Sequence, residues 1–236
     1  MKNKINIILP IAGLGQRFID GGYETPKPLI KFQNQHIVEK ALESLNTEDC
    51  NLIFIIRQEH IDNFNIDSIL KDKFGNDITL IVIDYVTEGA LCTCLLAEEY
   101  VNNNNPLVIF TPDCYFEPRF NPKSIEDKYD GMVVVFPSNS DAHSYVIVGE
   151  DGYVTEAAEK EVISNHAVGG LYYYKRGKDF IKYSHQLIND DVRIKNEFYI
   201  CPVFNYMIKE GGKVGIDKNT KHLILGTPKD LNNLEK

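Results

Sequence analysis

The sequence predicts an α/β fold: a Rossmann-like three-layer α/β/α arrangement around a mixed, mostly parallel sheet with an inserted antiparallel lobe. Three observations lead to this fold class. The first half alternates short apolar runs with longer helical patterns, the second half reads as strands joined by short turns, and no linker rich in Ser or Pro separates the halves. Strand–helix–strand alternation is typical of parallel βαβ units. A chain of 236 residues is long enough to bury one substantial core of this kind.

Four near-continuous apolar runs are the expected parallel strands, and they cover Ile5–Leu9, Leu52–Ile56, Thr79–Ile83 and Leu107–Thr111. Runs without polar alternation indicate strands that are covered on both faces. Apolar residues at helical spacing predict helices over His36–Leu45 and Ala90–Val101. Because ligands of such sheets gather at the carboxyl ends of the strands, the loops after Leu9, Ile83 and Thr111 are the expected binding region.

The second half is expected to add antiparallel strands to the same sheet. Its strand-like segments are joined by short turns, and they are Met132–Phe136, Ser144–Val148, Tyr153–Thr155 and Gly169–Tyr174. The Tyr172–Tyr174 run is expected in the core of its strand. Because there is no internal repeat and no abrupt change of charge, we expect a single domain over residues 1–236, whose halves 1–115 and 116–236 share one continuous sheet.

The composition argues against several classes of function. The chain carries 34 Asp and Glu against 25 Lys and Arg, a formal net charge of −9. This balance argues against nucleic acid as a partner, because phosphate backbones are bound by clustered cations, whereas a small anionic ligand needs only a few local cations and amides. No apolar run approaches the ~18 residues of a membrane-spanning helix and no signal peptide is evident, so we expect a cytoplasmic protein without a membrane partner. The five cysteines show no zinc spacing and are expected to be reduced thiols.

A glycine loop follows the first predicted strand and is the most informative stretch of the sequence. Gly13 and Gly15 let the backbone turn tightly and approach a ligand without a Cβ in the way. The amides of such a loop can converge on phosphate oxygens, and Arg17 adds charged donors. Two standard phosphate loops are excluded, since Phe18 stands where a dinucleotide fingerprint requires glycine and the Lys-Ser/Thr pair that follows the glycines of a P-loop is missing. The alternative is a simple turn in which glycine ends a strand.

A second unusual segment, Pro26-Lys27-Pro28-Leu29, follows the glycine loop. Prolines on both sides of a lysine hold the backbone extended and prevent a helix, so one cation is presented from a rigid loop. Together with Gly13-Leu14-Gly15-Gln16-Arg17, this segment resembles the signature of the nucleotidyltransferases that activate sugar phosphates, often called sugar-nucleotide pyrophosphorylases. Further segments resemble that family in the same order along nearly the whole chain, and they are Thr87-Glu88-Gly89, Leu107–Asp113, Glu159-Lys160, Gly169-Gly170-Leu171-Tyr172 and Gly226–Leu231.

The resemblance implies transfer of a nucleotidyl group from an NTP to a phosphorylated acceptor, with release of pyrophosphate. It implies two catalytic cations, Arg17 on the β- and γ-phosphates and Lys27 between the α-phosphate and the acceptor phosphate. It also implies that Asp113 holds Mg²⁺, an ion that prefers oxygen ligands and NTP phosphates. Residues 1–115 then form the nucleotide-binding half, with the nucleotide expected at Ala12, Gly13, Leu14, Gly15, Gln16, Thr87, Glu88 and Gly89. Residues 116–236 form the acceptor-binding half, with the acceptor expected at Glu159, Lys160, Gly170 and Glu197.

Two departures from the family pattern leave alternatives open. Many relatives carry a second metal-binding aspartate where this chain has Ile224, so Asp113 either works mainly with water and phosphates or shares the ion with another residue. The candidates for that second ligand are Asp217, Glu197 and His222. Cys114 directly follows Asp113, so the Asp-x-Asp pattern of the related glycosyltransferases is missing, which weakens that alternative. For Glu159 and Lys160, the alternative is a solvated charge pair.

The segments IAGLGQRF and TEGALCT are most similar to a branch of the family found in bacterial capsule and surface-polysaccharide loci. Within that branch the resemblance implies CTP as the nucleotide and phosphorylated glutamine as the acceptor. A sugar-1-phosphate nucleotidyltransferase that uses UTP, dTTP or GTP is the nearest alternative. A non-catalytic nucleotide-binding module, favoured by Ile224, and a glycosyltransferase of the related fold are the alternatives from other classes. The sequence leaves the base, the acceptor and the oligomeric state open, a homo-oligomer included.

Overall fold

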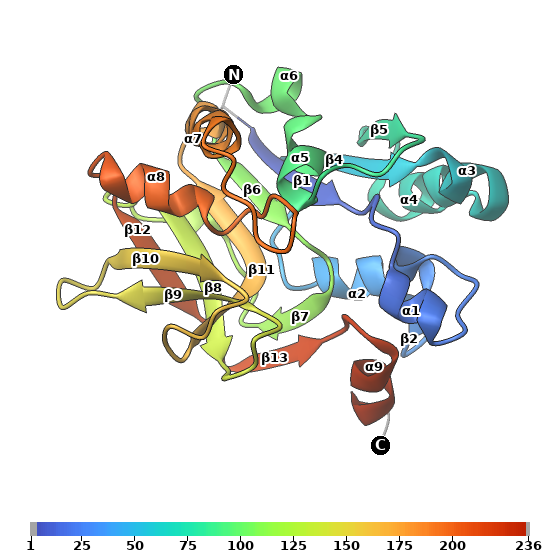
Figure 1. Ribbon diagram of the computed structural model, residues 1–236. Coiled ribbons are helices and arrows are strands. Elements are labelled where there is room, and N and C mark those ends of the chain that lie inside the picture. The colour runs from blue at the N-terminus through green and yellow to red at the C-terminus, as the bar shows by residue number, and fades with distance from the viewer. Residues whose placement is uncertain (1–3, 235–236) are drawn as a thin grey trace.

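The computed structural model describes residues 4–234, and its central feature is a nine-stranded mixed sheet (Figure 1). The strands of this sheet are β1 Ile5–Pro10, β4 Cys50–Arg57, β5 Thr79–Ile83, β6 Leu107–Phe110, β8 Gly131–Pro137, β9 Ser144–Val148, β10 Val154–Glu159, β11 His166–Tyr174 and β12 Val214–Lys218. Their order is β10-β9-β11-β6-β1-β4-β5, and β8 joins β11 to β12. The α-helices are α1 Gln16–Asp20, α2 Ile37–Leu42, α3 Gln58–Phe64, α4 Ile66–Phe74, α5 Ala90–Leu95, α6 Glu98–Val101, α7 Gly177–Asn189, α8 Val203–Lys209 and α9 Pro228–Leu234.

Strands β6, β1, β4 and β5 pair in parallel, as their apolar runs predict. The central strand β1 shows why the runs are continuous. Ile8 belongs to the core on one face of the sheet, whereas Ile7 and Leu9 belong to the core on the other face, and all three are fully buried. Because successive side chains point to opposite faces, a strand covered on both faces needs an apolar residue at every position.

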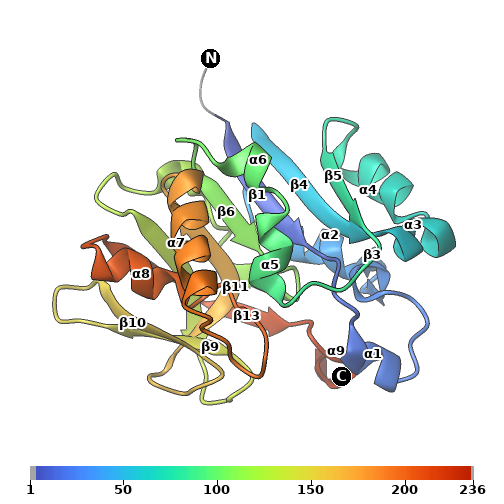
Figure 2. The same cartoon turned by 45° about the horizontal axis from the view of Figure 1, so that its top comes forward.

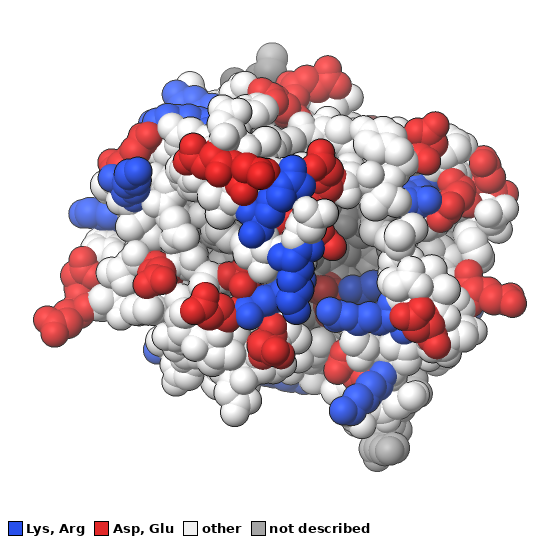
Figure 3. Space-filling view, viewed as in Figure 1, with Lys and Arg blue, Asp and Glu red and all other residues white. Residues whose placement is uncertain are grey.

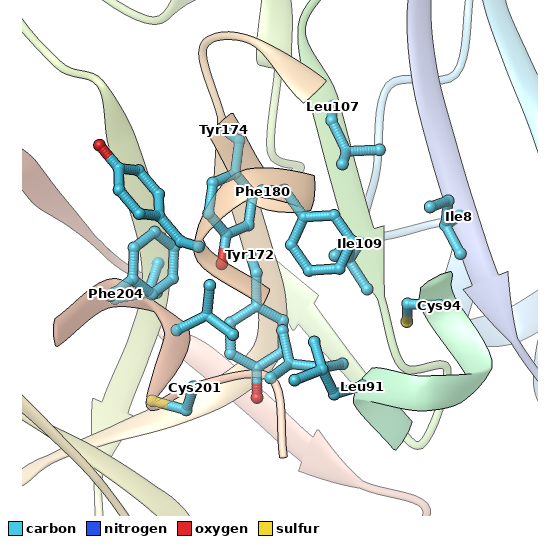
Figure 4. Packing of buried hydrophobic residues seen from close by; sticks show 14 of the residues in the cluster. Ile8, Leu91, Cys94, Leu107, Ile109, Tyr172, Tyr174, Phe180, Cys201 and Phe204 are labelled. Carbon is cyan, nitrogen blue, oxygen red and sulfur yellow. The ribbon is translucent and has the colours of Figure 1, made fainter. Parts of the chain in front are cut away.

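Helices cover both faces of the sheet, so the predicted three-layer fold is confirmed. Figure 2 shows α5, α6 and α7 in front of the sheet, and the buried residues of α8 belong to the same core. Within that core the Tyr174 and Phe204 rings stack with their centroids 4.7 Å apart (Figure 4). Helices α2 and α4 cover the opposite face through Val38, Leu42 and Leu70.

Strand β11 begins the antiparallel half of the sheet. It pairs antiparallel with β6, β8 and β9, and β10 extends this side as a hairpin with β9. The register of β11 against β8 shifts between Val168 and Tyr172, where the chain carries Gly169 and Gly170. The mixed sheet with an inserted antiparallel lobe is therefore as predicted, and Tyr172–Tyr174 is buried in β11.

Some element boundaries differ from the prediction. The helix predicted over Ala90–Val101 is two helices, α5 and α6. Around residue 96 the backbone N–H groups donate to carbonyls three residues back, as in a 3₁₀ turn, and this turn separates the two helices. The helix predicted over His36–Leu45 covers only Ile37–Leu42. The strand predicted at Tyr153–Thr155 continues to Glu159, because β10 stays paired with β9 up to that residue.

Two small sheets were not predicted. Strand β7, Cys114–Glu117, pairs antiparallel with β13, Lys221–Ile224, and β2, Lys31–Phe32, pairs with β3, Gln35–His36. The β7–β13 pairing places the C-terminal segment beside the loop after β6. Among residues 4–234, no helix is both long enough and apolar enough to cross a membrane.

Candidate active site

The glycine loop leaves β1 and packs against the segment around Lys27. Gly15 has a φ of 67°, a left-handed backbone that glycine adopts without strain. A Cβ at Gly15 would lie 3.3 Å from the Cβ of Lys27, so the glycine allows two separate loops to touch. Phe18, which replaces the glycine of a dinucleotide fingerprint, is 1% exposed and packs with Leu225 and Leu231. Phe18 therefore anchors the loop to the C-terminal segment.

Lys27 begins a short 3₁₀ turn, Lys27–Leu29, where the sequence predicted an extended segment. Pro26 is extended, with φ −61° and ψ 142°, but Pro28 fits the first turn of a helix because its missing N–H donor is not needed there. Pro28 and Leu29 are buried and hold the turn in place. The turn presents the Lys27 side chain, which is 23% exposed, with its Nζ 3.4 Å from Oδ2 of Asp113.

Asp113 lies just past the carboxyl end of β6, where neighbouring segments fix its position. The Thr111 hydroxyl donates to Oδ1 of Asp113 at 3.4 Å, and the Leu225 N–H donates to the Asp113 carbonyl at 2.7 Å. The Thr111 N–H donates to the Gly170 carbonyl at 2.9 Å. Gly170 has a φ of 72°, and a Cβ there would lie 2.5 Å from the Thr111 hydroxyl oxygen. Gly170, expected at the acceptor site, therefore also supports the loop that carries Asp113.

Two adjoining cavities meet at Arg17, Asp113 and Gly226. The first, of about 340 Å³, lies between the glycine loop, the Lys27 turn and the loop after β6, and the second, of about 350 Å³, lies between β13 and the loop from β8 to β9. Figure 3 shows a hollow near the middle of this face with Lys and Arg side chains beside it. The predicted residues that line the first cavity are Gly13, Gly15, Gln16, Arg17, Lys27 and Asp113. Ala12 is buried beneath the loop, and Leu14 is 43% exposed.

The predicted nucleotide loop Thr87–Gly89 joins β5 to α5 and interlocks with Phe198. The Phe198 N–H donates to the Glu88 carbonyl at 2.8 Å. A Cβ at Gly89 would lie 2.4 Å from the Phe198 carbonyl oxygen, which explains the glycine. The Glu88 carboxylate pairs with Arg193 at 2.7 Å. Thr87–Gly89 lines neither of the two cavities.

Glu159 and Lys160 stand at the end of β10, and both contact neighbouring side chains. The Ser144 hydroxyl donates to the Glu159 carboxylate, yet burial raises the pKa of Glu159 against that hydrogen bond and the Lys160 charge. The Lys160 Nζ donates to the Tyr199 hydroxyl and lies 4.2 Å from the centre of its ring. Burial, assisted by the charge of Glu197, also raises the pKa of Tyr199, and the same charge adds slightly to the effect of burial on the pKa of Glu159. Both side chains therefore have partners in the protein, and Tyr199 joins this cluster as part of the segment 196–199, which resembles the family segment beside the acceptor pocket.

A neutral histidine forms one wall of the second cavity. The His222 ring stacks on Phe136 at a centroid distance of 3.8 Å and an interplanar angle of 7°, and its Nδ1 accepts from Asn219 Nδ2 at 2.9 Å. Burial, assisted by His143 and opposed by Asp113, lowers the pKa of His222 to about 4. The ring is therefore neutral at pH 7, with its proton on Nε2. The sequence marked His222 as a candidate second metal ligand, and its spacing of two residues from Ile224 on one strand could have indicated that it lies on the same face.

The position of the usual second metal-binding aspartate is apolar here. Ile224 pairs across the β7–β13 sheet with the residue that follows Asp113. Of the alternative ligands, His222 lines the second cavity, whereas Asp217 and Glu197 line neither. Across residues 4–234, no group of three or more His, Cys, Asp or Glu side chains is arranged to hold a metal ion. A divalent cation at Asp113 would therefore depend on phosphate and water oxygens for its other ligands, an arrangement that suits Mg²⁺.

A mixed α/β sheet with a glycine loop, a lysine turn and an aspartate at the carboxyl ends of its central strands is a Rossmann-like fold. Within that fold class the chain belongs to the nucleotidyl transferase family, whose family model matches residues 5–212. No curated protein sequence matches the chain.

Solved structures with the same fold span nearly the whole chain. A nucleoside-diphosphate-sugar pyrophosphorylase from Vibrio cholerae has a TM-score of 0.82 at 21% identity, and the match covers 98% of this chain and 100% of that one. An inositol-1-phosphate CTP transferase from T. maritima has a TM-score of 0.73 at 18% identity, with 98% and 93% covered. A CTP:phosphocholine cytidylyltransferase from Streptococcus pneumoniae has a TM-score of 0.72 at 18% identity, with 98% and 97% covered. At these identities the likeness shows the fold.

Proposed function

We propose that this nucleotidyl transferase moves CMP from CTP to a small phosphorylated acceptor and releases pyrophosphate. The observation that carries the proposal is the distance of 3.4 Å between Lys27 Nζ and Asp113 Oδ2, in a cavity that Arg17 also lines. Two cations and one carboxylate around a single cavity suit a triphosphate together with a divalent ion. CTP is favoured because two of the structures that the chain resembles are described as CTP transferases.

The reaction needs positioning and charge neutralisation, without a protein nucleophile. An oxygen of the acceptor phosphate attacks the α-phosphorus of CTP, and the bond from that phosphorus to the oxygen bridging to the β-phosphorus breaks. Pyrophosphate carries the bridging oxygen away. Arg17 and the amides of Gly13–Gln16 hold the β- and γ-phosphates, and Lys27 lowers the repulsion between the α-phosphate and the acceptor phosphate. Mg²⁺ at Asp113, when bound, neutralises phosphate charge and orients the triphosphate.

The remaining predicted residues divide between the base and the acceptor. The loop Thr87–Gly89 holds the cytosine, while Glu159, Lys160 and Glu197 surround the acceptor, with the Lys160 ammonium on its phosphate. The buried Ser144–Glu159 contact supports this assignment, because a partly buried carboxylate with a raised pKa is more typical of a functional site than of a solvated charge pair.

Phosphorylated glutamine is the first candidate for the acceptor. An amino acid requires an anion for its ammonium group, and the second cavity offers the Asp230 carboxylate. The Asp230 carboxylate is held in place by Thr227, whose hydroxyl donates to Oδ2 at 2.6 Å. A sugar 1-phosphate is the alternative, and Ser138 and Ser140 in the same cavity favour it because hydroxyl groups pair well with sugar hydroxyls.

The product of this reaction is a nucleotide-activated metabolite of the kind from which capsules and surface polysaccharides are assembled. We place the reaction in the cytoplasm, where CTP is present, and the support is the resemblance of IAGLGQRF and TEGALCT to the branch from capsule loci. A homo-oligomer is compatible with this proposal, and sedimentation of the purified protein determines the oligomeric state.

The first experiment is a thermal-shift panel of CTP, UTP, ATP, GTP and dTTP, each with and without Mg²⁺. A ligand at 100 times its dissociation constant adds about 2.7 kcal/mol to the free energy of unfolding, so selective binding is visible. Pyrophosphate release is then measured with phosphorylated glutamine, phosphocholine, inositol 1-phosphate and glucose 1-phosphate as acceptors. We expect the largest shift with CTP and Mg²⁺. Selective binding of another nucleotide would reject the cytidylyl assignment.

A second candidate function is a nucleotide-binding module without catalysis, and the apolar Ile224 beside Asp113 favours it. Such a module would give the same thermal shift. It would release no pyrophosphate with any of the four acceptors, whereas the enzyme releases pyrophosphate with at least one.

A further inference from the structure

The nucleotide loop and the acceptor lysine are connected through two consecutive residues, Phe198 and Tyr199. Phe198 is 2% exposed, and its backbone bonds to the nucleotide loop on both sides. Its N–H donates to the Glu88 carbonyl at 2.8 Å, and its carbonyl accepts from the Leu91 N–H at 3.1 Å. Because Gly89 has no side chain, the two backbones lie in direct contact, and residues 88–91 cannot shift without Phe198.

Arg193 ties the same two segments together through its side chain. Its guanidinium pairs with Glu88 at 2.7 Å and lies 4.0 Å from the centre of the Phe198 ring. Asp191 holds the Nε of the same guanidinium in an ion pair at 2.5 Å. An arginine that is both paired and stacked is held more firmly than one in a single surface ion pair.

Tyr199 makes the connection on the acceptor side. Its hydroxyl accepts from the Lys160 ammonium, which also lies 4.2 Å from the centre of the Tyr199 ring. The Lys160 backbone has a φ of 56°, and its N–H donates to the His143 carbonyl at 3.0 Å. The lysine is thus held at its backbone and at the end of its side chain, and Tyr199 is the contact that sets where the ammonium lies.

We propose that Tyr199 is a positioning residue for Lys160, and that the Phe198–Tyr199 pair couples nucleotide binding to the acceptor site. This inference rests on the proposed function. A nucleotide that orders residues 87–89 fixes Phe198, and Tyr199 then holds the Lys160 ammonium where the acceptor phosphate arrives. Two sites that bias one shared segment affect each other's affinity reciprocally.

The first test uses Tyr199→Phe, which removes the hydroxyl and keeps the ring. The matched control is Tyr206→Phe, which removes a hydroxyl bonded to Asp190 at 2.8 Å on the outside of α8. With the acceptor that gives the fastest pyrophosphate release, we expect the KM for acceptor to rise about tenfold in Tyr199→Phe, the factor of one hydrogen bond to a charged group. The KM for CTP should stay within about twofold of the wild-type value. Tyr206→Phe should change neither constant.

The second test follows the labelling of Lys160 with an amine-reactive acetylating reagent, read by mass spectrometry, and needs no turnover. We expect Lys160 to be labelled several-fold faster in Tyr199→Phe than in the wild type, at unchanged melting temperature. CTP with Mg²⁺ should slow this labelling in the wild type and slow it less in Arg193→Gln, because that variant loses the tie to Glu88.

The outcomes separate this inference from the proposed function. If no acceptor gives pyrophosphate, the proposed function fails, while the labelling of Lys160 in the free protein still decides the role of Tyr199. If Tyr199→Phe is folded and shows wild-type labelling of Lys160, the positioning role is wrong. If CTP binds but slows labelling equally in the wild type and Arg193→Gln, the coupling between the two sites is wrong.

Discussion

Lys27 and Asp113 form an ion pair in the lining of the first cavity, with 3.4 Å between the ammonium nitrogen and the nearer carboxylate oxygen. Their side chains are 23% and 45% exposed. An ion pair with this much exposure contributes at most about 1 kcal/mol to stability. The pair therefore adds little to the stability of the fold. A phosphate group would bind the lysine, and its divalent cation would bind the aspartate, so ligand binding accounts better for the two charges.

Lys27→Ala should abolish turnover and leave the fold intact. We expect pyrophosphate release to fall by roughly 10²–10³-fold, the usual effect of removing one preorganised charged donor. The free energy of unfolding should change by less than about 1 kcal/mol, because the lost pair is partly solvated. Lys31→Ala, which removes an exposed lysine of β2, is the matched control and should keep full activity. Turnover retained in Lys27→Ala would overturn the assigned role of the lysine.

Asp113→Asn should change the metal dependence of the reaction. Wild-type activity should disappear in EDTA and return with Mg²⁺, since phosphate oxygens and one carboxylate are enough to hold that ion. In Asp113→Asn we expect the Mg²⁺ concentration for half-maximal activity to rise by about tenfold or more. Asp217→Asn tests the alternative ligand on β12 and should leave the Mg²⁺ titration unchanged. Identical titrations for Asp113→Asn and the wild type would exclude Asp113 as a ligand.

The sequence predicts the parallel half of the sheet well because the signals there are local. Each central strand is an apolar run that needs no partner to be seen, and glycine and proline mark the loops by their own backbone limits. The same local signals located Gly15, Arg17 and Lys27, which the structure brings into one cavity with Asp113.

Contacts between distant segments could not be read from the sequence. Strands β7 and β13 are short, and only their pairing with each other makes them strands, which also places Ile224 beside Asp113. Gly89 is explained only by the backbone of Phe198, more than a hundred positions away in the chain. Tyr199 likewise gains its role from Lys160, which lies just after β10 and 39 positions earlier in the chain.

Gly170→Ala should destabilise the protein and distort the Asp113 loop. The new Cβ would lie 2.5 Å from the Thr111 hydroxyl oxygen and 3.1 Å from the Thr111 carbonyl oxygen, on a backbone with a φ of 72°. Gly152→Ala separates the two effects, because Gly152 has a similar φ of 82° and open space around it. In urea denaturation we expect a loss of about 1 kcal/mol for Gly152→Ala and at least about 2 kcal/mol for Gly170→Ala. Equal losses would mean that the crowding at Thr111 relaxes freely.

His222 should make the free protein less stable in mild acid. Burial lowers its pKa from 6.5 to about 4, so between these values the unfolded chain binds a proton on His222 and the folded chain does not. The free energy of unfolding should therefore fall as the pH drops from about 6.5 to about 4, by up to roughly 3 kcal/mol from this residue.

His222→Gln isolates this contribution from those of His60 and His143, whose pKa values burial also lowers. Urea denaturation in EDTA and without nucleotide, at intervals between pH 4 and pH 7, keeps ligand effects at Asp113 out of the measurement. We expect a flatter dependence of unfolding free energy on pH in His222→Gln than in the wild type, because one proton uptake on unfolding is lost. Parallel curves for the two proteins would show that His222 is protonated equally in both states, and that its stacking on Phe136 does not keep the ring neutral.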